Sequence, residues 1–319
     1  MIPTHALGVD IGGTKTLVTL VDDSGTPGRV FAAPTPALNG PEAILDNAIG
    51  LARRVLSESS HPPLAMRDIG IGSAGVVDAK TGIVRFATTS LPGWAGTDIR
   101  GAFLRAFPAA VVTVVNDVQA FTLAETVHGS AAGRELVLGV MAGTGIGGGI
   151  VNGSIVQGAH FAAGHIGHVD VPSAAGMPCP CGRSGHLESV ASGTAMTAAY
   201  RRAGGDADDL QAVAAAANGG DVIAQGILDT GADALGLAIG SIANVLDPDQ
   251  IVVGGGVASL GEWWLARVRK AAGKTTMPLI GEPRIALGTL GEAAVAIGAA
   301  RVARPLPAVV TLPLQVGTR

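Results

Sequence analysis

Hydrophobic residues along this chain follow two patterns, namely short apolar runs that end in glycine and longer stretches with helical spacing. Residues 6–22 form apolar runs on both sides of Gly12-Gly13, which predicts two strands joined by a tight turn. Residues 136–149 repeat this unit, with a second glycine-rich loop from Gly143 to Gly149. The repeat predicts a duplicated α/β architecture with a cleft between its halves.

The other apolar stretches alternate between strand-like and helix-like spacing. We predict strands over residues 68–78, 111–115 and 250–253, and helices over residues 41–57, 118–128, 188–202, 207–246 and 291–304. The tail after residue 304 contains prolines and is expected to be extended. The last helix is expected to return to the first half. We therefore divide the chain into residues 1–118 plus about 291–319 and residues 119–290.

The composition limits the class of protein. The chain has 319 residues, 48% of them hydrophobic, which is enough for two domains with their own cores. A net charge of −4 without a basic cluster argues against nucleic-acid binding. No apolar run reaches the roughly eighteen residues of a membrane span, and no signal peptide is apparent. The two cysteines, one residue apart, are poorly placed for a disulfide, so a cytoplasmic location is expected.

Both cysteines belong to one short segment that is rich in metal-ligand side chains. Cys179 and Cys181 are flanked by His168 and His186. Two thiolates and two imidazoles can close a tetrahedral zinc site with no open position, which predicts a structural metal. The alternative is two surface cysteines among scattered histidines. Glu188 follows the segment, either held rigidly by it or serving as a first-turn carboxylate of the next helix.

Three glycine-rich loops could bind a nucleotide. The first, from Asp10 to Lys15, offers free backbone N–H groups and two side-chain donors to a phosphate, although it is also a plain hairpin turn. The second begins at Gly143, and two such loops facing each other could hold a polyphosphate. The third, Gly254 to Gly256, could let a nucleoside lie against the backbone or could serve close packing. No P-loop motif is present.

The pair Asn116-Asp117 stands where a predicted strand meets a predicted helix. An aspartate at this position is more often a helix N-cap than a catalyst. The functional alternative is a general base that accepts the proton of a hydroxyl attacking a phosphoryl group.

Taken together, these motifs resemble the ROK family of sugar kinases and sugar-responsive repressors over essentially the whole chain. The matching segments are Asp10-Ile-Gly-Gly-Thr-Lys15, Ser73-Ala-Gly-Val-Val-Asp78, Leu91-Pro-Gly-Trp94, Asn116-Asp117, Gly143-Thr-Gly-Ile-Gly147, Gly167-His168, Cys179-x-Cys181-Gly-x-x-Gly185 with Glu188, and Val253-Gly-Gly-Gly256.

The resemblance implies an α/β fold with two lobes, of the actin-like and hexokinase-like (ribonuclease H-like) ATPase type, around an inter-domain cleft. It also implies phosphoryl transfer from ATP, with Mg²⁺, to the 6-hydroxyl of a hexose or hexosamine. Asp117 matches the general base of such kinases. Asn116, His168 and Glu188 match residues that hold sugar hydroxyls. The residues expected to bind the nucleotide are Asp10, Gly12, Gly13, Thr14, Lys15, Gly143, Thr144, Gly145, Gly254, Gly255 and Gly256.

The chain departs from the family pattern at three positions. His168, Cys179 and Cys181 match zinc ligands of the family, but the third family cysteine is replaced by His186, and we expect the Zn²⁺ site to survive as Cys₂His₂. His165 replaces a glutamate that contacts the sugar near its anomeric end, in a form similar to bacterial N-acetylmannosamine kinases.

The third departure is Ser90, which stands in place of an asparagine before Leu-Pro-Gly-Trp. We expect Ser90 and Gly75 to line the sugar site.

We therefore predict an ATP-dependent sugar 6-kinase, with N-acetylmannosamine as the leading acceptor. Glucose, another amino sugar or a cyclitol are the alternatives, and a homodimer is expected from the resemblance. A sugar-responsive repressor is disfavoured, because only nine residues precede Asp10 and the family's repressors carry a helix-turn-helix domain there. A zinc-stabilised scaffold without catalysis is ranked lower still. We expect no nucleic-acid or membrane partner.

Overall fold

Two five-stranded sheets of the same topology form the framework of the molecule in the computed structural model, which describes residues 5–59 and 68–304. Each sheet combines an antiparallel hairpin with parallel strands, in the orders β3-β2-β1-β4-β7 and β10-β9-β8-β11-β12. The first sheet contains β1 (Ala6–Ile11), β2 (Lys15–Val21), β3 (Phe31–Pro34), β4 (Asp68–Ser73) and β7 (Val111–Asn116). The second contains β8 (Leu136–Ala142), β9 (Ile146–Asn152), β10 (Ser154–Ile155), β11 (Gln250–Gly254) and β12 (Ile285–Leu287).

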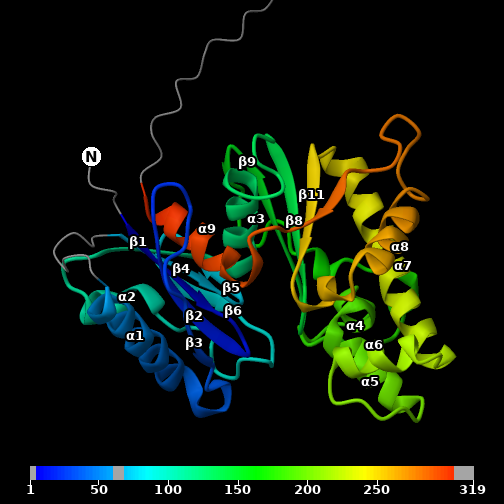
Figure 1. Ribbon diagram of the computed structural model, residues 1–319, viewed down its shortest axis with the longest axis horizontal. Coiled ribbons are helices and arrows are strands. Elements are labelled where there is room, and N and C mark those ends of the chain that lie inside the picture. Colours follow the sequence, from blue (N-terminus) through cyan, green and yellow to red (C-terminus); the bar gives the residue numbers. More distant parts are fainter. Residues whose placement is uncertain (1–4, 60–67, 305–319) are drawn as a thin grey trace, which may run out of the picture.

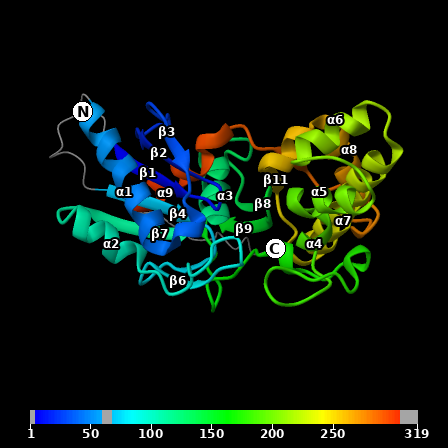
Figure 2. The same cartoon turned by 90° about the horizontal axis from the view of Figure 1, so that it is seen from below.

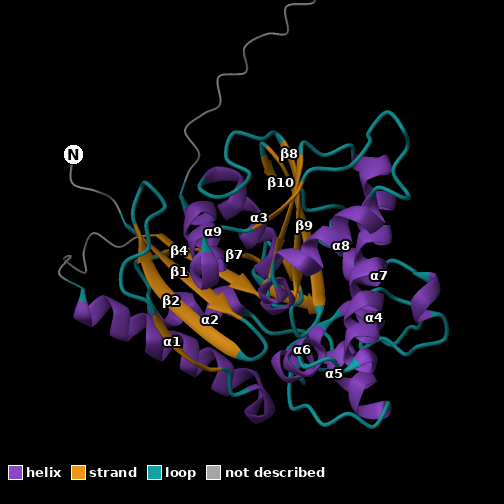
Figure 3. Cartoon of the chain, turned by 45° about the vertical axis from the view of Figure 1, so that its right-hand side comes forward, coloured by secondary structure: helices purple, strands orange, loops and turns teal. Residues whose placement is uncertain are grey.

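The helices form layers around these sheets, as Figures 1 and 2 show. Helices α1 (Gly40–Glu58) and α2 (Ile99–Ala106) lie against the first sheet, and α3 (Asp117–Val127) and α9 (Ala294–Ala303) lie between the two sheets. Beyond the second sheet lie α4 (Glu188–Ala191), α5 (Gly193–Arg202), α6 (Leu210–Asn218), α7 (Val222–Leu246) and α8 (Glu262–Ala272), as Figure 3 shows. A small sheet of β5 (Val76–Asp78) and β6 (Ile83–Phe86) follows β4. The result is the two-lobed α/β fold that the sequence predicted.

The last helix packs on the first sheet, because small residues on both sides allow a close approach. Eight of the ten residues of α9 are buried, most of them alanine. Gly8 and Gly70 lie beneath this helix, and a Cβ at either position would overlap the backbone of Ala296 or Ala299. The chain therefore returns from the second sheet to the first, as predicted. The division at residues 118 and 291 itself stays a proposal.

Within residues 5–59 and 68–304, one helix is long and apolar enough to cross a membrane by length and composition. This helix is α7, and half of its most apolar window is buried inside the protein. It packs against α8 and α6. Helix α7 is therefore explained by its place in the core of the second lobe.

The differences from the predicted elements occur where the chain turns sharply. Residues 68–78 form β4 and β5 in two separate sheets, because Gly75 has a φ of +94° and breaks the strand. The predicted helices over residues 188–202 and 207–246 form four helices, with breaks inside the predicted ranges at residue 192 and at residues 219–221. The hydrophobic pattern does not predict six of the observed elements, namely β3, β6, β10, β12, α2 and α8. The predicted extended tail lies outside the described residues.

Candidate active site

Two cavities meet between the lobes at the two glycine loops. One has a volume of about 1130 Å³ and the other of about 960 Å³. Gly13, Thr14, Gly143 and Thr144 line both of them. The register explains this meeting, because the β1–β2 and β8–β9 hairpins occupy the same place in their sheets. We call the larger space the acceptor cavity and the smaller one the donor cavity.

Asn116 and Asp117 lie at the acceptor cavity, where β7 passes into α3. Asn116 is the N-cap of α3, because its Oδ1 accepts hydrogen bonds from Val118 N (3.0 Å) and Gln119 N (3.1 Å). The alternative to catalysis for Asp117 was the role of helix N-cap, and in the structure Asn116 has that role. The Nδ2 group of Asn116 donates to Gly75 O (2.9 Å) and to Asp117 Oδ1 (2.7 Å). Its amide is thus engaged within the protein, and sugar binding by Asn116 stays a prediction.

Asp117 carries the chemistry that a proton transfer needs. Its Oδ1 accepts from Val118 N (2.9 Å) as well as from Asn116, so among the described residues Oδ2 is the oxygen left for a substrate hydroxyl. Burial raises the pKa of Asp117 to about 6, against the lowering effect of these hydrogen bonds. A carboxylate with this pKa is unprotonated at neutral pH and is still basic enough to accept a proton.

Asp10 stands close to Asp117 at the end of β1 and lines the donor cavity. Burial, followed by repulsion from Asp117, raises the pKa of Asp10 to about 8, while Lys15 lowers it. The charge of Asp117 disfavours a second negative charge on Asp10, which a divalent cation would offset, and oxygen ligands are those that Mg²⁺ prefers. The residues present therefore fit Mg²⁺ at Asp10.

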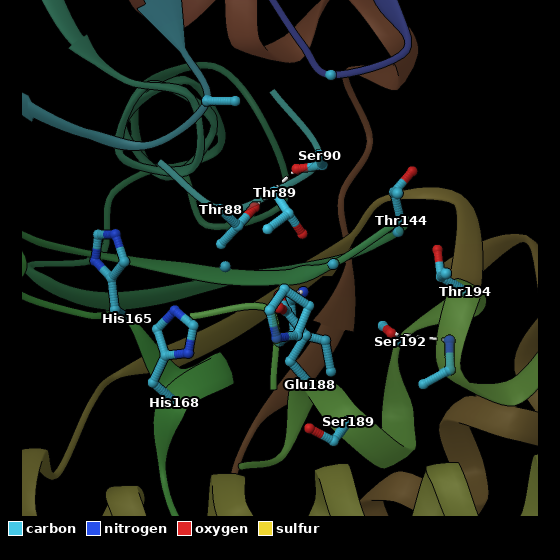
Figure 4. Close-up of a pocket in the computed structure, with 18 of the residues that line it drawn as sticks. Thr88, Thr89, Ser90, Thr144, His165, His168, Glu188, Ser189, Ser192 and Thr194 are labelled. Atoms are coloured by element: carbon cyan, nitrogen blue, oxygen red, sulfur yellow. Dashed lines mark hydrogen bonds between the residues drawn. The ribbon is translucent and has the colours of Figure 1, made fainter. Parts of the chain in front are cut away.

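The acceptor cavity has a hydroxyl-rich side and an imidazole-rich side (Figure 4). Thr88, Thr89 and Ser90 come from the loop after β6, and Thr88 Oγ1 and Ser90 Oγ lie 2.8 Å apart in a hydrogen bond. Across from them lie His165 and His168, which precede and end a short 3₁₀ helix, Ile166–His168. Gly75 also lines this cavity.

The two imidazoles are stacked, with ring centroids 6.3 Å apart. Burial lowers the pKa of both His165 and His168, so each ring is neutral at pH 7. Nδ1 of His165 is buried without a hydrogen-bond partner among the described residues.

Glu188 begins α4 and connects it to the second hairpin. Its Oε2 accepts a hydrogen bond from Ile146 N (2.8 Å), and its side chain is buried. A Cβ at Gly145 would overlap this carboxylate. Gly145 lines the acceptor cavity but not the donor cavity. The absence of a side chain at this position therefore makes room for Glu188 and not for a phosphate.

His168, Cys179, Cys181 and His186 form one cluster, with their ligand atoms all within 4.8 Å of one another. Cys179 Sγ lies 3.7 Å from His168 Nδ1, and Cys181 Sγ lies 3.3 Å from His186 Nδ1. Ordinary zinc bond lengths place tetrahedral sulfur and nitrogen ligands about 3.6 Å apart, so the cluster fits Zn²⁺. Both cysteines are free thiols. His168 offers Nδ1 to the cluster while it also lines the acceptor cavity.

The donor cavity is lined by Gly254, Gly255 and Gly256, where β11 ends. Gly12 and Lys15 lie on the facing side. The Lys15 ammonium forms an exposed ion pair with Glu292 at 2.7 Å, so a phosphate would compete with that carboxylate for it.

Several lining residues were not identified from the sequence. Thr88 and Thr89 in the β6–α2 loop carry no motif, and nothing in their spacing marks them. Ser192 and Thr194 could have been found from the sequence, because a serine is a typical helix N-cap. Ser192 is the N-cap of α5, with Oγ accepting from Ala195 N at 3.1 Å. Thr194 lines both cavities.

Two joined cavities with a carboxylate on the wall of each suit a phosphotransferase, because one cavity can hold the donor and the other the acceptor. Residues 6–305 match the ROK family. A glucokinase of Halalkalibacterium halodurans is 30% identical over 308 residues, which cover 92% of each chain. An N-acetyl-D-glucosamine kinase of Pectobacterium atrosepticum is 27% identical, over 92% of this chain and 97% of the relative.

The solved structures agree with these sequences. A ROK family glucokinase from Streptomyces griseus, in complex with glucose and AMPPNP, superposes with a TM-score of 0.82 and 30% identity. The match covers 94% of this chain and 99% of that one. The chain belongs to the ROK family, and it is a sugar kinase.

Proposed function

We propose that this sugar kinase transfers the γ-phosphoryl group of ATP to the 6-hydroxyl of a hexosamine, with N-acetylmannosamine as the leading acceptor and Asp117 as general base. The observation that carries the proposal is the Asp117 carboxylate, which lines the acceptor cavity near Asp10 of the donor cavity, has a pKa raised to about 6 and keeps one oxygen for the substrate. Proton removal by such a group typically contributes about 10²–10⁴-fold to the rate.

The nucleotide would lie in the donor cavity, with its phosphates between the loops at Gly12 and Gly143 and its nucleoside against Gly254–Gly256. Backbone N–H groups at glycine turns favour anionic oxygens. Mg²⁺ held near Asp10 would supply the positive charge that offsets the charge of the phosphates. The AMPPNP complex of the S. griseus glucokinase supports ATP as the donor.

The acceptor is inferred from His165. A glutamate at this place could only accept hydrogen bonds from sugar hydroxyls, whereas a neutral imidazole carries one N–H donor and one acceptor. An acetamido group offers a carbonyl that needs a donor. A neutral His165 on the cavity wall therefore favours a 2-acetamido sugar over glucose, which is the alternative supported by the glucokinase relatives.

Zinc in the Cys/His cluster would act as a brace and not in the reaction, because four protein ligands leave no position for a substrate. Its role would be to fix the ring of His168, whose other nitrogen can reach a sugar hydroxyl, and to hold the segment that leads into Glu188. We also propose, from the resemblance, a homodimer in the cytoplasm.

The test is a panel of acceptors with ATP and Mg²⁺, comparing kcat/KM for N-acetylmannosamine, N-acetylglucosamine, glucose, mannose and kanosamine. We expect N-acetylmannosamine to have the highest value, with ADP release dependent on the sugar. If kcat/KM were highest for glucose, glucose would replace N-acetylmannosamine as the proposed acceptor, and the proposal that Asp117 is the general base would still stand. Turnover of none of these sugars would contradict the proposed reaction.

A further inference from the structure

A second buried carboxylate, Glu125, lies near the end of α3, two helical turns beyond Asp117. Its side chain is fully buried, and it lies at the wall of the donor cavity. The chain passes between the two sheets twice. We call the stretch between α3 and β8 the first crossing and the stretch between β12 and α9 the second crossing. Glu125 is hydrogen-bonded to both crossings.

The carboxylate of Glu125 bonds to both crossings. Its Oε2 accepts from Ser130 N at 2.8 Å, in the first crossing. Its Oε1 accepts from Thr289 N at 2.9 Å and from Leu290 N at 3.0 Å, in the second. A buried carboxylate with backbone donors on both oxygens fixes those donors, because losing it would leave buried N–H groups unpaired.

The surroundings are built around this carboxylate. A Cβ at Gly288 would lie 2.8 Å from Glu125 Oε1, and a Cβ at Gly129 would overlap Oε2. Gly288 N donates to Val253 O at 2.9 Å, one residue before the glycines at the end of β11. The second crossing is therefore held to β11 on one side and to α3 on the other.

The segment that Glu125 holds is part of the donor cavity. Leu287, Gly288, Gly291 and Glu292 all line that cavity. Helix α3 in turn begins at Asp117 and packs on α9, β8 and β9. A shift of the second crossing relative to α3 would thus move the wall of the donor cavity relative to the base.

We infer that Glu125 is a positioning residue, which joins the two inter-lobe crossings and sets the donor cavity in register with Asp117. It holds no substrate atom. Its effect passes through Thr289 and Leu290 to the nucleotide, and through α3 to the base. The inference rests on the proposed use of ATP.

Two substitutions test this role, one in the carboxylate itself and one in a residue packed against it. Glu125→Gln keeps the shape but turns one oxygen into an N–H₂ group that faces backbone donors. Gly129→Ala keeps the carboxylate but crowds it from the side away from the donor cavity. For each we expect KM for ATP to rise by about tenfold and kcat to fall, while KM for the sugar stays within about threefold. The double variant should be non-additive, because both changes act on one carboxylate.

The control is Ile239→Val, which removes a buried methyl group from α7, away from both crossings. It should lower Tm without changing either KM. A purely structural Glu125 would behave like this control, so unchanged KM for ATP in both variants would overturn the inference. The inference would also be overturned if kcat, KM for ATP and KM for the sugar all worsened equally, in proportion to the fraction of unfolded protein. The wild-type enzyme is assayed first, and its failure to use ATP would contradict the proposed function instead.

Discussion

The two hairpins that face each other across the cleft have the same place in their sheets but carry different chemistry. The first hairpin brings its own charges, with Asp10 at the end of β1 and Lys15 at the start of β2. The second hairpin, around Gly143 and Gly145, contains no charged side chain in its loop. Its carboxylate is Glu188, which bonds to Ile146 N from 42 residues further along the chain.

The difference between the hairpins lies in what is inserted after them. Strand β10 is followed by the whole segment from residue 156 to residue 221 before α7, whereas only residues 35–39 separate β3 from α1. The long insertion carries the Cys/His cluster and α4 to α6. The first lobe therefore holds Asp117 and, beside it, Asp10 with a pKa that Asp117 helps to raise, a pair that suits Mg²⁺ and proton transfer. The second lobe holds neutral imidazoles that suit a sugar.

The largest test of this comparison removes Asp117, the proposed base of the first lobe. Asp117→Asn should lower kcat by about 10²–10⁴-fold, because the amide cannot accept the proton of the sugar hydroxyl. Sugar binding by calorimetry should persist, since the contacts of the second lobe remain. Asp98→Asn is the matched control, because Asp98 caps α2 through Gly101 N at 2.7 Å in the same lobe. Near-native turnover of Asp117→Asn would refute the assignment of the base.

The next test disrupts the brace of the second lobe. Removing zinc with a chelator, or Cys181→Ser, should lower kcat/KM for the sugar by about 10–100-fold and reduce Tm. Nucleotide affinity should change little, because the donor cavity contains no residue of the cluster. His160→Ala is the control, since this exposed histidine lies outside the cluster. Unchanged melting after metal analysis has verified zinc removal would contradict the brace.

The pH dependence tests the charge of the first lobe. Asp117 must be unprotonated to act as a base, and burial raises its pKa to about 6. At saturating nucleotide and Mg²⁺, kcat/KM for the sugar should therefore fall about tenfold for each pH unit below about 6. The rate is measured from pH 4.5 to 8, with circular dichroism to verify folding. A flat profile down to pH 5 would place the essential pKa elsewhere.

The smallest expected effect sharpens the chemistry of the second lobe. His165→Glu should shift the ratio of kcat/KM for N-acetylmannosamine to that for glucose by about tenfold toward glucose, because the carboxylate accepts from hydroxyls but cannot donate to an acetamide carbonyl. Ser90→Asn is the companion variant on the opposite wall of the cavity. If the ratio does not move in His165→Glu, another residue sets the acceptor.

Much of this site was readable because its motifs are local. The cluster of His168, Cys179, Cys181 and His186 spans only a short stretch, so ligand spacing alone predicted that these residues meet. The two hairpins were predicted for the same reason, since a glycine turn between apolar runs is sufficient to specify one. The repeat of that unit also predicted two related halves, although not the order of the strands within each sheet.

The remaining features could not be read in this way. Thr88 and Thr89 reach the acceptor cavity only because their loop crosses to face His165. The bonds of Glu125 join residues 164 and 165 positions apart. Asn116, and not Asp117, is the N-cap of α3. If the helix began one residue later, Asp117 would be the cap instead. Periodicity reports which face of an element is buried, not which distant element lies against it.

The sequence by itself determined the two repeated hairpins, the Cys/His cluster and the family, because each depends on residues that are near neighbours in the chain. Only the tertiary structure decided that Glu188 would support the second hairpin, that two cavities would meet beside Asp117, and that Glu125 would join both crossings. These contacts depend on the register of two sheets and on the packing of α3 against α9, which a one-dimensional pattern does not specify.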